Sequence, residues 1–398
     1  MPSQGAVMIE VSAHLTRGLT FLAGEIVECS IAFTCPSNAT SSLESLAWAS
    51  AQLHCQCHIS SSKVILPKMP ADEKSEELEM LQSSVNTSLA PSRGEKGQCI
   101  LSTEPKILFC DLKLKPGERK TFLYRETIPS DAPPSYRGQA VKYSYKVTIG
   151  MQRVNCPIRL LRVPFRVLVL YGLGDTSLQE QEDQAASSNP FLAEERTKNS
   201  LLDLAVQVLN TVTSRKNPRD SYNIKNSEGP VARFCLFKPA YKLGEDIIGT
   251  IEFPASCTVP CIQYSVVLQS EEHIAEECRR KPHQGVSMSS HGRHQEFCLH
   301  MSKSHMVLPI PLHVTPGFIT DIVCLKWRLH FEFITAKEPL PDHVIPADQS
   351  ESALWQGPQS LNVDTLVWNL PIKILPTNPL HASTSTTLLT KTPTAVTV

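Results

Sequence analysis

The two halves of the sequence contain the same strand-forming unit, and this repeat limits the fold more than any other feature. Each copy has an aromatic residue, then a Gly-Glu pair, then a run in which every second position has the same phase. The first copy comprises Phe21, Gly24, Glu25, Val27, Cys29, Ile31 and Phe33, and the second comprises Tyr241, Gly244, Glu245, Ile247, Gly249, Ile251 and Phe253. The copies lie too far apart for a solenoid or propeller, whose repeats are about 20 to 50 residues long. The repeat therefore predicts two tandem domains.

Strict alternation of apolar and polar residues predicts that both domains are built from strands. The segments 141–149 and 325–333 alternate without a break, which is typical of an antiparallel strand with one buried face. Two further segments, 164–168 and 371–375, each begin with a proline, as a closing or edge strand can. We therefore expect an all-β fold of two tandem antiparallel β-sandwiches.

The expected domains span residues 7–170 and 231–375. The linker between them, 171–230, contains one helical pattern from Leu201 to Val212, whose apolar stripe includes Leu204 and Val208. A helix this short is marginal in isolation, so we expect it to dock on a domain or on a partner. Residues 70–93 and 337–357 are expected to be loop-like, and the Ser/Thr-rich tail 376–398 is expected to be disordered.

Composition and charge narrow the class of protein. Lys and Arg total 38 and Asp and Glu total 39, so the near-zero net charge argues against nucleic-acid binding by bulk electrostatics. No stretch has the length of a membrane span and the N-terminus lacks a secretory signal pattern, so we expect a cytoplasmic chain. The 13 cysteines are odd in number and irregularly spaced, which predicts reduced thiols.

The common catalytic signatures do not occur in the sequence. It contains no glycine-rich phosphate loop, no Gly-x-Ser-x-Gly and no His-Glu-x-x-His, so we expect neither an enzyme nor a cofactor. The segment His54–His58 has two His and two Cys, but in a strand the Cys and His side chains point to opposite faces. We therefore expect buried cysteines rather than a metal site, because four ligands cannot converge there.

Three features suggest contacts with partners, each beside a simpler interpretation. The first is a group of arginines, which form either a basic patch for a membrane or partner or the solvated face of a closing strand. The second is the basic, His-rich stretch 279–305, interpreted as a solvated loop or as a contact for an acidic partner surface or for phospholipid head groups. The third, Asn189-Pro190-Phe191, has the form of a peptide bound by endocytic adaptors or is a chance tripeptide. The arginines are Arg153, Arg159, Arg162 and Arg166.

Several motifs resemble the arrestin-like superfamily and, within it, the Rgp family. Domain one contains Leu-Lys-Pro-Gly-Glu at 114–118 and Pro-Pro-Ser-Tyr-Arg-Gly at 133–138, and domain two contains Pro-Gly-Phe at 316–318. The runs that resemble the Rgp family are 99–103, 105–112, 325–333 and 370–376. No string of buried charges between the domains is evident, so receptor-type arrestin activation is not expected.

The resemblance implies a function without bond chemistry. Rgp is the smaller, arrestin-like subunit of the Ric–Rgp complex, which releases GDP from the Golgi GTPase Rab-six. A member would be a non-catalytic scaffold that pairs with a Ric-type β-propeller subunit, lies in the cytoplasm and peripherally on the Golgi membrane, and acts only with its partner. The alternative is an arrestin-like cargo-sorting adaptor in endosome-to-Golgi transport, and a metal-dependent enzyme is a third interpretation.

Overall fold

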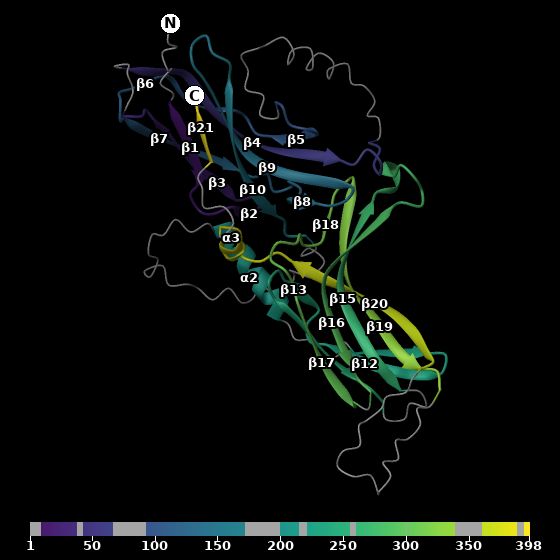
Figure 1. The fold of residues 1–398 in the computed structure, drawn as a ribbon. Helices are drawn as coiled ribbons and strands as arrows, with labels where there is room; N and C mark the ends of the chain where they lie inside the picture. Colours follow the sequence, from purple (N-terminus) through teal and green to yellow (C-terminus); the bar gives the residue numbers. More distant parts are fainter. Residues whose placement is uncertain are drawn as a thin grey trace, which may run out of the picture.

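The chain folds into two β-sandwiches that follow each other in sequence and meet at one end (Figure 1). A computed structural model describes residues 9–37, 43–66, 93–171, 200–214, 221–254, 260–299, 301–338, 360–387 and 394–398. The all-β class and the two tandem sandwiches expected from the sequence are confirmed.

Domain one packs a four-stranded sheet against a seven-stranded sheet. The smaller sheet has the order β21 (Thr394–Thr397), β1 (Glu10–Leu15), β3 (Ile26–Thr34), β7 (Arg119–Thr127). The larger has the order β2 (Thr20–Leu22), β10 (Arg159–Leu168), β9 (Val141–Gln152), β4 (Glu44–Ile59), β5 (Gln98–Ser102), with β6 (Lys106–Leu114) on β4 and β8 (Tyr136–Arg137) on β9.

Domain two repeats this arrangement with a four-stranded and a six-stranded sheet. The smaller sheet has the order β11 (Ser221–Asn226), β12 (Gly229–Leu236), β14 (Asp246–Glu252), β17 (Lys303–Pro309). The larger has the order β13 (Ala240–Lys242), β20 (Val363–Leu375), β19 (Val323–Ala336), β15 (Cys261–Ile274), β16 (Val286–Phe297), with β18 (Phe318–Ile319) on β19. The remaining elements are α2 (Ser200–Ser214), the 3-10 turn η4 (Glu276–Cys278) and α3 (Pro379–Thr387).

The two copies of the internal repeat make equivalent backbone hydrogen bonds. Gly24 and Gly244 have φ angles of 88° and 82°, a left-handed conformation that favours glycine. Their N–H groups donate to the carbonyl oxygens of Ile128 and Ile310, which hold equivalent positions in the two domains. The short strands before these turns, β2 and β13, both pair in parallel with the closing strands β10 and β20. These two parallel pairs depart from the purely antiparallel arrangement that the sequence suggested.

Three segments differ from what the sequence predicted. Strand β11 and the start of β12 lie within 221–230, which we had assigned to the linker. Within the tail expected to be disordered, the structure has α3 and β21, and β21 pairs with β1 at the edge of domain one. The basic stretch 279–305 is largely strand β16 and the start of β17 rather than a loop, because its residues complete the two sheets of domain two.

Three of the sequence predictions lie outside the described residues. Most of the segments 70–93 and 337–357 and all of Asn189-Pro190-Phe191 belong to the parts of the chain that the structure does not describe. Of the described helices, none is long and apolar enough to span a membrane.

Each of the two hydrophobic cores extends across the domain junction. The core of domain one includes Ile274, Phe318 and Val323 from domain two, and the core of domain two includes Leu168 from domain one. The rings of Tyr136 and Phe318 meet edge to face, with centroids 5.0 Å apart. This shared apolar packing favours a fixed relation between the sandwiches.

A buried carboxylate of domain two binds the backbone of domain one. Glu272 of β15 is 4% exposed and lies against the chain between β8 and β9. Its oxygens accept hydrogen bonds from the backbone N–H groups of Gln139, Ala140 and Val141, at 2.8, 3.1 and 3.3 Å. A buried carboxylate needs such donors because burying an unpaired charge is strongly unfavourable.

Arg166 of β10 makes the reciprocal contact from domain one. Its guanidinium donates to the carbonyl oxygens of Leu312 and Val314 at 2.7 and 2.6 Å. Burial lowers the pKa of Arg166 to about 10, so it remains charged at neutral pH. Arg166 and Glu272 thus both join the domains, and each binds backbone groups of the other domain rather than an opposite charge.

Replacing Glu272 with Ala would remove the acceptor of three backbone N–H groups at the junction. Each buried donor without an acceptor costs about 1 to 3 kcal/mol, so we expect the free energy of unfolding, measured by urea denaturation, to fall by at least about 2 kcal/mol. The control is Glu276→Ala, because that carboxylate is 88% exposed and should change stability by less than about 0.5 kcal/mol. Equal losses in the two variants would contradict the role of Glu272.

Candidate functional site

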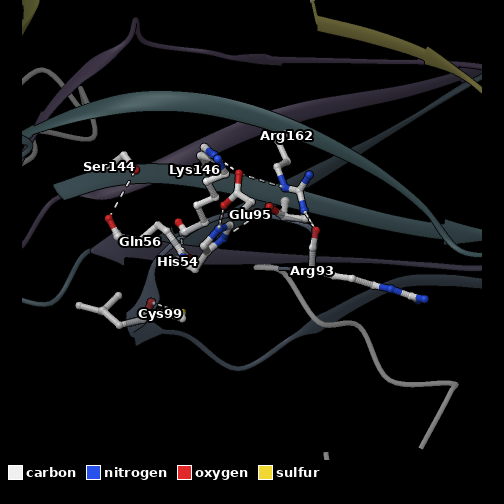
Figure 2. Close-up of polar contacts among 11 residues, drawn as sticks. His54, Gln56, Arg93, Glu95, Cys99, Ser144, Lys146 and Arg162 are labelled. Carbon is white, nitrogen blue, oxygen red and sulfur yellow. Dashed lines mark hydrogen bonds and ion pairs between the residues drawn. The ribbon is translucent and has the colours of Figure 1, made fainter. Parts of the chain in front are cut away.

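Four ionisable side chains converge on the outer face of the large sheet of domain one (Figure 2). Glu95 lies in a segment, residues 93–103, that we call the strap because it crosses this face and contains β5. Its carboxylate is paired with Lys146 of β9, lies 3.5 Å from Nε of Arg162 on β10, and lies 3.4 Å from Nε2 of the fully buried His54 on β4. One carboxylate thus faces three basic groups from three strands.

Strand geometry explains why these side chains meet. His54 is directly opposite Lys146 in the β4–β9 register, and Arg162 is directly opposite Thr148 in the β10–β9 register. Residues two apart in a strand share a face, so Lys146 and Thr148 lie side by side on β9. Thr148 also contacts the other ring nitrogen of His54, at 3.4 Å.

The strap is fixed at both ends by further hydrogen bonds. Near its start, Arg162 donates to the carbonyl oxygen of Arg93 at 2.6 Å. Near its end, Gln52 of β4 donates to the hydroxyl of Ser102 at 2.6 Å. Gly97 passes so close to β4 that a Cβ atom there would lie 2.3 Å from the carbonyl oxygen of Cys57, so only glycine fits.

The charges of the cluster shift two pKa values. Burial lowers the pKa of His54, and the nearby cations Lys146 and Arg162 lower it further, against the opposing effect of Glu95. Burial raises the pKa of Glu95, but its hydrogen bonds with Lys146 and His54 and the charge of Arg162 outweigh burial, so the pKa lies below the usual value. At neutral pH the arrangement is therefore a neutral imidazole beside an ionised, fully engaged carboxylate.

This chemistry suits an anchor better than a catalyst. The Glu95 carboxylate is already bound by cations and has a lowered pKa, which makes it a weak base. His54 has no exposed surface through which it could reach a substrate. Within the described ranges, no group of three or more His, Cys, Asp or Glu side chains could hold a metal ion. In the segment 54–58, the buried Cys55 and Cys57 face the core, on the opposite side of β4 from His54.

Comparison with known proteins identifies the family. A sequence model described as Rgp1 matches residues 23–175 and 171–336. The chain belongs to the Rgp1 family. A protein of Homo sapiens named "RAB6A-GEF complex partner protein 2" is 52% identical over 386 residues, which are 94% of this chain and 97% of that protein. The protein of the same name from Bos taurus is 52% identical over 376 residues, 92% of this chain and 93% of its own. The resemblance to the Rgp family that the sequence motifs indicated is thus confirmed.

In this Rgp1-family chain, the four arginines that the sequence analysis grouped together lie in different parts of the structure and differ in their contacts. Arg153 pairs with Glu44 at 3.0 Å, Arg162 belongs to the Glu95 cluster, and Arg166 joins the domains. Arg159 is exposed, and its phase in β10 is opposite to that of Arg162 and Arg166. The structure therefore does not gather them into one patch.

The linker helix forms and docks through part of the expected stripe, because Ala205 and Leu209 belong to that stripe and are buried. Helix α2 buries Leu202, Ala205 and Leu209 against domain two, whereas Leu204 is 62% exposed and Val208 is half-buried. Apolar residues occupy more than one side of this helix, so the sequence pattern did not separate the buried part of the stripe from its exposed part at Leu204. Leu204 and Val208 stay as predicted contacts for a partner.

Sequence reasoning missed Glu95 and Glu272. Both act through contacts with residues distant along the chain, for which the sequence has no local signal. A partial signal existed for the basic half of the cluster, because strand phase placed Lys146 on the polar face of β9.

Replacing Glu95 with Gln should loosen the strap. The change removes the charge that Lys146 and Arg162 bind, and a hydrogen bond to a charged group contributes about 1.5 to 3 kcal/mol. We expect the amides of β5 to exchange with solvent deuterium at least about tenfold faster, as followed by mass spectrometry. The control is Glu104→Gln, because Glu104 is exposed and follows the strap directly. Unchanged β5 exchange in the Glu95 variant would contradict the anchor.

The strap should also loosen in mild acid. The unfolded chain protonates His54 near its ordinary pKa of about 6.5, whereas burial lowers the folded pKa, so the unfolded state binds more protons below that pH. The stability due to neutral His54 is therefore lost as the pH falls below about 6.5. The contribution of Glu95, whose folded pKa is also lowered, is lost in more acidic solution, below about pH 4.3.

The measurement is β5 deuterium exchange at pH 7.0 and 5.5, corrected for the intrinsic exchange rate. We expect faster opening at pH 5.5 in the native chain and a much smaller pH effect in His54→Gln. The matched control is His58→Gln, because His58 lies on the same strand but is exposed. If the native chain opened equally at both pH values, the linkage to His54 would be wrong.

Proposed function

We propose that this chain is a non-catalytic scaffold subunit of a guanine nucleotide exchange factor that releases GDP from a Golgi Rab GTPase, Rab-six. The observation that carries the proposal is the 52% identity, over more than nine-tenths of the chain, to proteins named as partners in a RAB6A exchange-factor complex. Such identity extends through both sandwiches, so the proposal concerns the whole platform and not a single motif.

Nucleotide exchange requires selective binding of one state of the GTPase, and no covalent bond is formed or broken. A complex that binds the nucleotide-free GTPase more tightly than the GDP-bound form weakens GDP binding by the same factor, because the two affinities are linked. Two sandwiches fixed by a common core, by Glu272 and by Arg166 supply a platform of constant shape for such a contact.

We propose further that the chain acts with a larger Ric-type subunit that contains a β-propeller, and that it has little activity alone. An edge strand with apolar side chains supports a role in assembly. Among the strands that the structure describes, β16 pairs with β15 alone, and its Met288 and Phe297 are exposed. Exposed sheet edges of this kind are surfaces on which a second chain can pair.

For the contacts themselves, we propose α2 for the partner and Arg159 for the membrane. Leu204 and Val208 present apolar surface that the chain does not itself bury completely. Arg159 is the exposed member of the arginine group, and a basic residue near an anionic membrane contributes about 1 kcal/mol. We propose accordingly that the complex acts in the cytoplasm and peripherally on the Golgi membrane.

The test follows fluorescent GDP leaving purified Rab-six in the presence of this chain, of the larger subunit, or of both. We expect release to be at least about tenfold faster with both subunits and close to the intrinsic rate with this chain alone, because the complex must form to bind the nucleotide-free state. Intrinsic release in the presence of both subunits would reject exchange-factor function and favour the cargo-sorting adaptor.

Variants of the reconstituted pair locate the contacts. Leu204→Asp should weaken assembly, whereas Asp203→Asn, a neighbouring exposed position of α2, should not. Arg159→Glu should lower binding to anionic vesicles with assembly unchanged. Assembly that is insensitive to Leu204→Asp, or vesicle binding that is insensitive to Arg159→Glu, would remove that residue from the proposal.

A further inference from the structure

An apolar groove lies at the junction of the two sandwiches, with walls from both. Domain one contributes Ile100 of β5 in the strap and Tyr171 after β10, and domain two contributes Ile319 of β18. These large apolar side chains are 43, 45 and 53% exposed, although they surround one groove. The buried Tyr143 and Phe318 form part of its lining. Grouped exposure of this kind marks a binding surface more often than scattered exposure does.

Two carboxylates border the groove. Asp131, in the turn before β8, and Asp321, in the turn after β18, also line it, and both residues are exposed. Among the ion pairs of the described ranges, none includes either residue. Burial raises the pKa of Tyr143 to about 12, and the charge of Asp321 makes a small contribution in the same direction.

The groove is held in shape by the contacts that hold the domains and the strap. The hydroxyl of Tyr143 lies 3.2 Å from that of Thr320, a hydrogen bond that joins the two domains at the groove. Glu272 fixes the domains a short distance away, and Glu95 fixes the strap that carries Ile100. A site formed before binding loses less conformational entropy when a ligand is bound.

We propose that this groove binds a segment of another protein of the exchange complex that has a large apolar side chain flanked by Lys or Arg. The apolar walls select the central side chain, because burying apolar surface is favourable. Asp131 and Asp321 select the flanking cations through charge complementarity, which determines specificity and steers association. The inference rests on the proposed function, since that function supplies the partner.

The experiment places a photo-crosslinking amino acid at Ile319 in the full chain, within the complex reconstituted with the larger subunit and Rab-six. The control places it at Ile248, which is 43% exposed on the smaller sheet of domain two. We expect at least fivefold more cross-linking to a partner from position 319. Mass spectrometry of the product should identify a segment with an apolar residue and a Lys or Arg within three positions of it.

Charge variants test the rim separately. Asp131→Asn combined with Asp321→Asn should reduce cross-linking from position 319 about tenfold, whereas Asp364→Asn, an exposed carboxylate on β20, should not. Asparagine keeps the size of the side chain, so the fold should remain, and urea denaturation checks this.

Each result decides the proposal. Cross-linking no greater than at position 248, a product from a second copy of this chain, a segment without basic residues, or yields insensitive to Asp131 and Asp321 would each overturn it. GDP release measured on the same samples separates the two proposals. Accelerated GDP release without a cross-link from position 319 would reject only the proposed groove. A cross-link to a basic segment without accelerated GDP release would support the groove and reject the exchange function.

Discussion

The arrangement of this protein depends on a buried carboxylate that binds backbone rather than an opposite charge. Glu272 is satisfied only when domain two presents it to the N–H groups that precede and begin β9. Because those donors have fixed positions in domain one, the contact defines how the sandwiches meet as well as whether they meet. Arg166 imposes the same condition in the reverse direction through two carbonyl groups. Hydrophobic packing at the junction lacks this directionality, so the charged groups add orientation to the stability that the shared core supplies.

The strap uses the same kind of contact on a smaller scale. Glu95 brings together cations that would otherwise repel each other on one face of the sheet, and it covers the buried polar residues of β4. Each group depends on the others, because removing the carboxylate would leave Lys146 and Arg162 as neighbouring like charges. The anchor matters at the junction because Ile100, five residues after Glu95, forms a wall of the apolar groove.

The repeat and the alternation were sufficient to predict the sandwiches, because both are local consequences of packing one face of a strand. Gly24 and Gly244 could be equated because both must adopt a left-handed conformation. Local patterns of this kind could not predict pairing between strands that are distant in the sequence. The β21 strand adds to β1 across the length of the chain, and a polar Ser/Thr-rich sequence gives no sign of it. The arginines were grouped because they are close in sequence, and this closeness did not show that Arg159 points to the opposite face of β10 from Arg162 and Arg166.

For the proposed function, a fixed junction has a direct consequence for nucleotide exchange. Each tenfold weakening of GDP binding requires the complex to prefer the nucleotide-free GTPase by about 1.4 kcal/mol. A platform whose halves reoriented freely would lose part of that preference to the entropy of ordering them on binding. Glu272, Arg166 and the shared core provide this order before any partner arrives. If the chain acts in exchange as proposed, binding energy from surfaces on both sandwiches would act together on one GTPase, which a flexible pair of domains could not achieve with the same contacts.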